Sequence, residues 1–139
     1  MNGTGTLFAL CLLCLAPPLP AAADSPPSAE AVALAACRGR YTAALEDAWL
    51  VGINVEAIRM RRDLFAAMLD ALTGDTAATA SMNRHLLSQR IAQKNAAARL
   101  LDAARFGADP RRARHARILI AQQLATCDGL LLDRTRIGA

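Results

Sequence analysis

The chain has 139 residues, of which 54% are hydrophobic, 4% aromatic and 20% charged, and it carries 16 basic against 12 acidic residues for a net charge of +4. The basic residues are spread along the chain with few aromatic side chains among them. This pattern excludes the basic and aromatic surface with which proteins bind nucleic acid.

Residues 1–23 have the pattern of a secretory signal peptide. The apolar run 7–16 is too short to span a bilayer, and the small residues Ala21, Ala22 and Ala23 follow it as a signal-peptidase site would. We therefore expect cleavage after Ala23, no stable membrane anchor afterwards, and a periplasmic or secreted protein. What remains is long enough for one domain and too short for two.

The mature chain is predicted to be all-α. Residues 24–28 contain Pro26 and Pro27 and are expected to form a flexible N-terminus. Residues 29–133 lack strand signals and are Ala- and Leu-rich, which predicts a single helical-bundle domain. We expect 134–139 to be a C-terminal tail.

The first helical region carries two apolar rows. One steps by three and four residues, as a bundle-packing helix does, and comprises Cys37, Tyr41, Ala44, Ala48, Val51, Val55, Ile58, Arg62, Phe65, Leu69 and Leu72. The other lies on a different side and comprises Trp49, Ile53, Met60 and Leu64. A helix with two apolar faces lies centrally in a bundle or meets another subunit, so a homodimer is predicted.

The central stretch 76–106 reads as one long helix, with Asp75 or Thr76 as its N-cap and Gly107 as its stop signal. Its apolar stripe is expected to contain Leu86, Leu87, Ile91, Ala97, Ala98, Leu101 and Ala104. Polar Asn83, Arg90 and Lys94 project from the middle of that stripe, where charges need partners.

The last helix begins with Pro110 in its first turn and is expected to end near Asp133. It packs through Ala113, Ala116, Ile120, Leu124, Cys127 and Leu131. Arginines 111, 112 and 114 crowd its first turn, and we interpret them as a solvated face rather than an anion site.

Cys37 and Cys127 are the two cysteines of the mature chain, and in an oxidising compartment they are expected to form a disulfide. In an up-down bundle of three long helices they would lie roughly 30 Å apart along the axis, whereas a disulfide requires Cα atoms within about 7 Å. A break of the first helix near Gly52 would bring them to within about a dozen ångströms by the same helical rise, so a bundle of four helices fits better. The unbroken apolar row favours a continuous helix instead. The alternative is a continuous helix with free or intersubunit cysteines.

No catalytic motif is present. The sequence lacks a Gly-x-Ser-x-Gly elbow and a phosphate-cradling glycine loop, and Ser88 lies with His85 on an outer helix face. His85, His115 and the two cysteines are too few and too scattered for a metal site. We therefore expect no metal, no cofactor and no enzymatic activity.

The inward cations Arg62, Arg90 and Lys94 are the candidate site. In one interpretation their heads reach water or pair with acids such as Glu46, Asp47 or Glu56 on a neighbouring helix. In the other they bind a small oxyanion between helices or between subunits, because arginine forks suit planar oxyanions. Asn83 would assist, and His85 would contribute less because it points away from the stripe.

The segment LSQRIAQK at 87–94 resembles the Leu-Ser-Gln-Arg-Met/Ile-Ala-Lys segment of the PilJ/NarX-like domain. That family comprises periplasmic helical bundles of nitrate/nitrite sensors and of type IV pilus chemotaxis transducers. Its sensor members bind the anion at a dimer interface with two arginines five residues apart; Arg90 matches the second, and His85 stands at the first. The resemblance implies a non-enzymatic anion-binding or sensing-accessory protein.

A second resemblance is enzymatic. Lys94, Asp102 and Arg105, with the turn 107–110, are similar to helix-borne active-site residues of secreted all-α chorismate mutases. The alternatives to an anion-binding protein are therefore a chorismate mutase-like enzyme and a structural bundle without a small ligand.

Overall fold

A computed structural model describes residues 26–74 and 79–137, with 134–137 as backbone alone. The expected signal peptide and the N-cap candidates Asp75 and Thr76 lie outside this part of the chain. Four helices are present: α1 (Ala29–Val51), α2 (Val55–Gly74), α3 (Ala80–Phe106) and α4 (Pro110–Ile137). The predicted all-α class and the four-helix version are confirmed, because α1 and α2 are separate helices.

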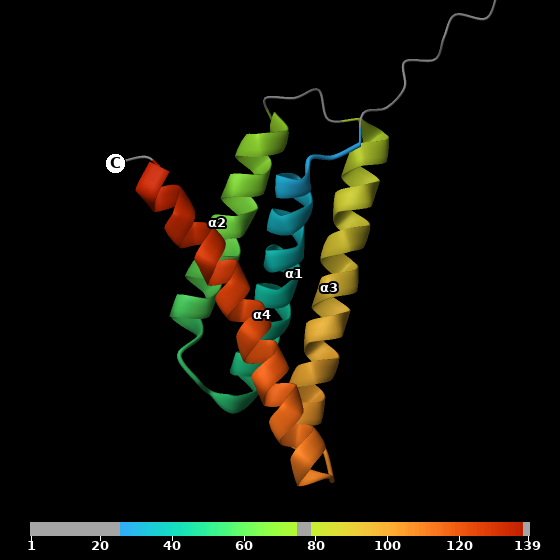
Figure 1. The fold of residues 1–139 in the computed structure, drawn as a ribbon, viewed down its shortest axis with the longest axis vertical. Coiled ribbons are helices and arrows are strands. Elements are labelled where there is room, and N and C mark those ends of the chain that lie inside the picture. Colours follow the sequence, from blue (N-terminus) through green and yellow to red (C-terminus); the bar gives the residue numbers. More distant parts are fainter. Residues whose placement is uncertain (1–25, 75–78, 138–139) are drawn as a thin grey trace, which may run out of the picture.

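The helices run alternately down and up, so helices that follow one another in the chain are antiparallel (Figure 1). Helix α1 lies between α2 and α3, and α4 crosses the bundle obliquely. Helix α1 also supplies most of the fully buried residues, many of them alanines. The fold is therefore built around α1.

Glycine ends α1. Gly52 adopts the left-handed conformation, with φ of 69°, and its N–H donates to the Ala48 carbonyl, as does that of Ile53. Asn54 then accepts from the Glu56 N–H at 3.1 Å and starts α2. The apolar row that favoured an unbroken helix is divided at this turn, and its two halves belong to the antiparallel helices α1 and α2.

Two other helix ends are set by side-chain caps. Thr79 accepts from the Met82 N–H at 3.2 Å, so α3 starts at Ala80 and the predicted start at 76 is wrong. Asp109 accepts from the Arg111 N–H at 2.8 Å ahead of α4. Helix α4 continues past Asp133 to Ile137.

The buried face of α3 is narrower than its sequence indicates. Leu86, Ala97 and Ala104 are buried as expected, but Leu87 and Ile91 are 46% and 47% exposed. Their placement in the core was wrong, because α3 meets α1 along a strip of small residues rather than across a broad face.

The helices come into backbone contact in that strip at Gly39. A Cβ at this position would lie 2.3 Å from the Arg90 carbonyl oxygen and 3.1 Å from the Lys94 nitrogen. Both are backbone atoms, which cannot rotate away. Gly39 therefore allows the two helix backbones to touch.

A disulfide and a polar cluster hold the helices on the other side of α1. Cys37 and Cys127 are bonded, with Cα atoms 5.6 Å apart, as predicted. Tyr41 stacks on Phe65 of α2 and donates to Asp128 of α4, which also pairs with Arg61 at 3.1 Å. Burial, together with the Asp128 carboxylate, raises the pKa of the Tyr41 phenol, which therefore stays protonated.

We predict that Gly39→Ala destabilises the protein by about 2 kcal/mol, because overpacking outweighs the better helix propensity of alanine. Thermal unfolding followed by circular dichroism should show Tm lowered by roughly 6–12 °C. Gly129→Ala is the control, since no atom lies within 4 Å of its Cβ position in α4. If the Gly39→Ala protein is as stable as the control, α1 and α3 are not in backbone contact.

We expect the disulfide to contribute roughly 4–5 kcal/mol in the chain-entropy model, which ignores strain, since it closes a loop of 90 residues. Reductant should lower the Tm of the wild type and leave that of the Cys37→Ala/Cys127→Ala double variant unchanged. Free thiols at both positions in non-reducing peptide mapping would contradict the bond, and dimers dissolved by reductant would indicate an intersubunit bond.

Candidate functional site

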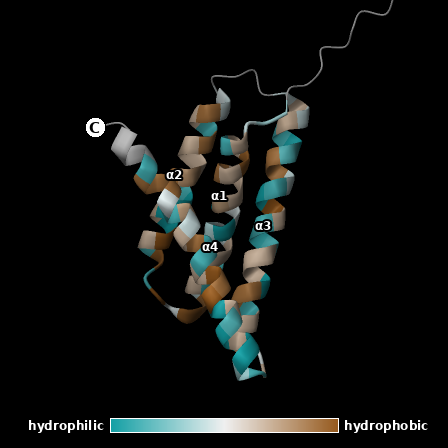
Figure 2. Ribbon diagram, in the orientation of Figure 1, coloured by the Kyte–Doolittle hydropathy of each residue, from teal (hydrophilic) through white to brown (hydrophobic). Residues whose placement is uncertain are grey.

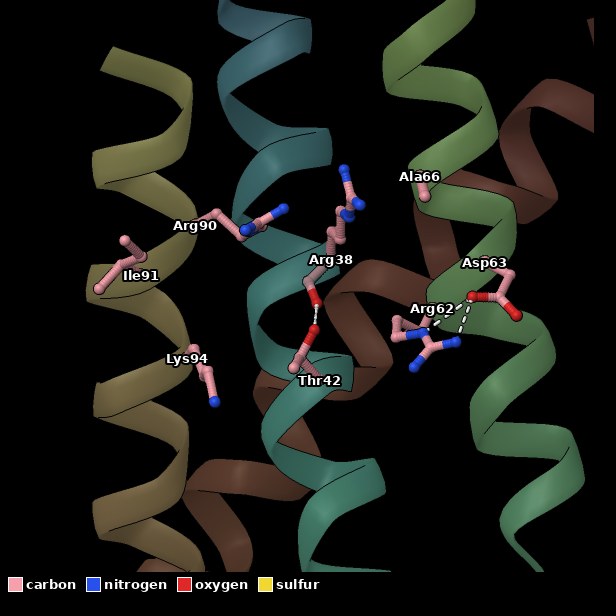
Figure 3. A pocket seen from close by; sticks show the side chains of 8 residues that line it. All are labelled: Arg38, Thr42, Arg62, Asp63, Ala66, Arg90, Ile91 and Lys94. Carbon is pink, nitrogen blue, oxygen red and sulfur yellow. Dashed lines mark hydrogen bonds and ion pairs between the residues drawn. The ribbon is translucent and has the colours of Figure 1, made fainter. Parts of the chain in front are cut away.

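Three of the predicted site residues meet in one cleft of about 400 Å³ between α1, α2 and α3 (Figure 3). The residues that line it are Arg38, Thr42, Arg62, Asp63, Ala66, Arg90, Ile91 and Lys94. None of them comes from α4. Arg62, Arg90 and Lys94 were expected from the sequence to lie together, and the structure brings them together.

The helix periodicity and the Gly39 contact explain this placement. Residues four apart share a helix face, which pairs Arg90 with Lys94 on α3 and Arg38 with Thr42 on α1. Gly39 packs against the backbone between Arg90 and Lys94, so the neighbouring Arg38 lies beside them. Arg90 extends from α3 toward Arg38 (Figure 3).

Two of the four cations have carboxylate partners. Lys94 pairs with Glu46 of α1 at 2.6 Å, and Arg62 pairs with its neighbour Asp63 at 2.5 Å. Glu46 is one of the acids that the sequence offered as a partner. These pairs are partly exposed, so each adds little to stability.

Arg38 and Arg90 are different. Within residues 26–74 and 79–133, neither guanidinium has a hydrogen bond or an ion pair, although both side chains are half-buried. Arg40, by contrast, donates twice to Gln93 and once to Cys127 Sγ, and its burial lowers the pKa of its guanidinium. Arg40 is therefore a packing residue, whereas Arg38 and Arg90 have donors to spare.

The structure does not bring the other two predicted residues to the cleft. Asn83 and His85 are exposed on α3 and do not line it. Arg38 was not predicted as a site residue, because it lies beside the apolar row of α1 and not on it. Its sequence signal is adjacency to Gly39, where a close helix contact forms.

A second cleft of about 430 Å³ lies between α1, α3 and α4, and its lining includes Asp47, Arg105 and Arg117. Both of its cations have partners. Arg105 pairs with Asp47 at 2.5 Å, and Arg117 donates to the Ala104 carbonyl at 3.1 Å. Lys94 and Arg105, which carry the resemblance to chorismate mutases, therefore line different clefts.

Among residues 26–74 and 79–137, no three His, Cys, Asp or Glu residues lie close enough to hold a metal ion. In the same part of the chain, no helix has the length and apolar character needed to cross a membrane. Comparisons with profiles of known protein families, with curated proteins and with solved structures found no match.

Proposed function

We propose that this protein is an exported, non-enzymatic helical bundle that binds a small anion between α1, α2 and α3, as a binding or sensing-accessory protein. The observation that carries the proposal is the pair Arg38 and Arg90, two guanidinium groups without a partner among the described residues that line one cleft. Two like charges facing one space repel each other, and an oxyanion between them relieves the repulsion.

The resemblance to the PilJ/NarX-like domain supports the proposal at Arg90. The family's other arginine falls at His85 in this chain, and His85 is exposed outside the cleft. Arg38 of α1 offers the second guanidinium instead. An anion site of this kind joins neighbouring helices of one chain and uses a different pair from the family's motif.

We predict that Arg90→Gln abolishes stabilisation by anions. A ligand at about one hundred times its Kd stabilises the wild type by roughly 2.7 kcal/mol, and each kcal/mol moves Tm by about 3–6 °C. Thermal melts should be compared across nitrate, nitrite, sulfate, phosphate and carboxylates at constant ionic strength, which removes general screening. Without anion, the variant should be at least as stable as the wild type, because Arg90 has no partner to lose.

The control is Arg99→Gln, which removes an exposed arginine of the same helix outside the cleft and should leave the anion response unchanged. The proposal fails if no anion stabilises the wild type more than the Arg90→Gln protein. A prephenate-formation assay on the purified protein tests the enzymatic alternative, and turnover there would replace the binding role.

We also propose that the protein is a homodimer. Trp49, Ile53, Met60 and Leu64 are 54%, 59%, 63% and 45% exposed, so the bundle does not cover this row. The break of the first helix divides the row: Trp49 lies at the end of α1, Ile53 in the α1–α2 turn, which is strongly apolar (Figure 2), and Met60 and Leu64 on α2. Large exposed apolar side chains near one end of a bundle mark a protein interface, and a second copy brings an identical set.

We expect light scattering to give the mass of a dimer for the wild type and of a monomer for the Met60→Gln/Leu64→Gln double variant. Burial of each side chain on association supplies the driving force that the glutamines remove. Ile118→Gln on α4, where the side chain is 49% exposed, is the control and should remain dimeric. A wild-type monomer at high concentration would exclude the homodimer.

A further inference from the structure

The cleft is larger than one inorganic oxyanion requires. Its volume of about 400 Å³ lies within the range of small-molecule sites, roughly 300–1,000 Å³. Water occupies only about 30 Å³ per molecule in the liquid, and a nitrate- or sulfate-sized ion is not many times larger. The cleft has room for an organic body in addition to an anionic group.

The charges of the cleft set the charge of the ligand. Four cations line it, and the carboxylates of Asp63 and Glu46 offset two of them, Arg62 and Lys94. Arg38 and Arg90 remain, and they leave the site with an excess of two positive charges. A ligand with two negative charges neutralises this excess.

Part of the cleft wall is apolar. Ala66 of α2 and Ile91 of α3 line it, and Ile91 is 47% exposed although it is a branched aliphatic side chain. The Thr42 hydroxyl donates to the Arg38 carbonyl at 2.7 Å, so its proton is already used. A ligand that carries aliphatic carbon can therefore bury it against Ala66 and Ile91.

From the size, charge and apolar wall together, we infer that the ligand is an aliphatic dicarboxylate. Each carboxylate pairs with one of the two guanidinium groups that carry the excess charge, Arg38 and Arg90, and the methylene chain lies against Ala66 and Ile91. Arg62 and Lys94 keep their ion pairs with Asp63 and Glu46. This inference rests on the proposed function, because it specifies the ligand of the same anion site.

The dicarboxylate inference is tested by isothermal titration calorimetry of the full chain with malonate, succinate, glutarate and adipate at constant ionic strength. Sulfate and butyrate are the comparison ligands. Each methylene group that the cleft buries should tighten binding by up to about fourfold, until the chain is too long for the cleft. Succinate should bind at least roughly tenfold tighter than butyrate, which has the same number of carbons but lacks the second charge-assisted contact.

Two matched variants separate the contribution of the apolar side chains to ligand affinity from that of the charged ones. Ile91→Asn should weaken binding of the best dicarboxylate by about threefold to tenfold, as loss of an apolar contact does, and leave the affinity for sulfate unchanged. Leu87→Asn changes a side chain of equal exposure on the same helix, outside the cleft, and should affect neither ligand.

The results distinguish this inference from the proposed function. Equal affinities along the dicarboxylate series overturn the inference that the ligand is organic, and so does sulfate binding as tight as that of the best dicarboxylate. In either case anion binding itself stands, provided that Arg90→Gln abolishes the binding of sulfate and of the dicarboxylates. If the wild type binds no anion in these titrations and no anion of the thermal-melt panel stabilises it, the inference and the proposed function fail together.

Discussion

The close approach of α1 and α3 at Gly39 is the contact on which the rest of the structure depends. The α1 backbone lies so near the Arg90 carbonyl that a single methyl group would not fit. Helices that touch without side chains between them have a fixed separation and register. That register decides what the neighbours of Gly39 meet: Arg38 enters the cleft beside Arg90, and Arg40 reaches Gln93.

One turn of α1 around this contact connects all the other helices. Its side chains reach Cys127 on α4, Gln93 on α3 and Phe65 on α2, through Cys37, Arg40 and Tyr41 respectively. The alanines that follow along α1 allow neighbouring helices to pack closely on several sides. A helix of small residues is thus suited to the centre of a bundle, although it contributes little apolar area for each residue.

The helix break and the disulfide could be predicted from the sequence, because they depend on local backbone conformation and on the lengths of the helices. A break near Gly52 shortens the distance between Cys37 and Cys127 along the bundle, and glycine there can adopt the left-handed conformation that ends α1. Helical periodicity, however, shows which side of a helix is apolar and not how much of that side a neighbouring helix covers. Leu87 and Ile91 point toward the predicted stripe, yet they stay exposed because α3 contacts α1 along a narrow strip. The same limit explains Arg38, whose place in the cleft follows from the Gly39 contact between helices rather than from periodicity.

The candidate site combines an unfavourable charge arrangement with a rigid frame. Arg38 and Arg90 lie in one cleft without carboxylate partners among the described residues, so their repulsion opposes the packing of α1 against α3. The disulfide from Cys37 to Cys127 joins α1 to α4, which contributes nothing to the cleft, and it limits the freedom of the unfolded chain. The frame can therefore hold the two arginines in place before a ligand arrives. An anion that binds them gains their full attraction with little loss of conformational entropy in the protein, because the helices that carry them are already ordered.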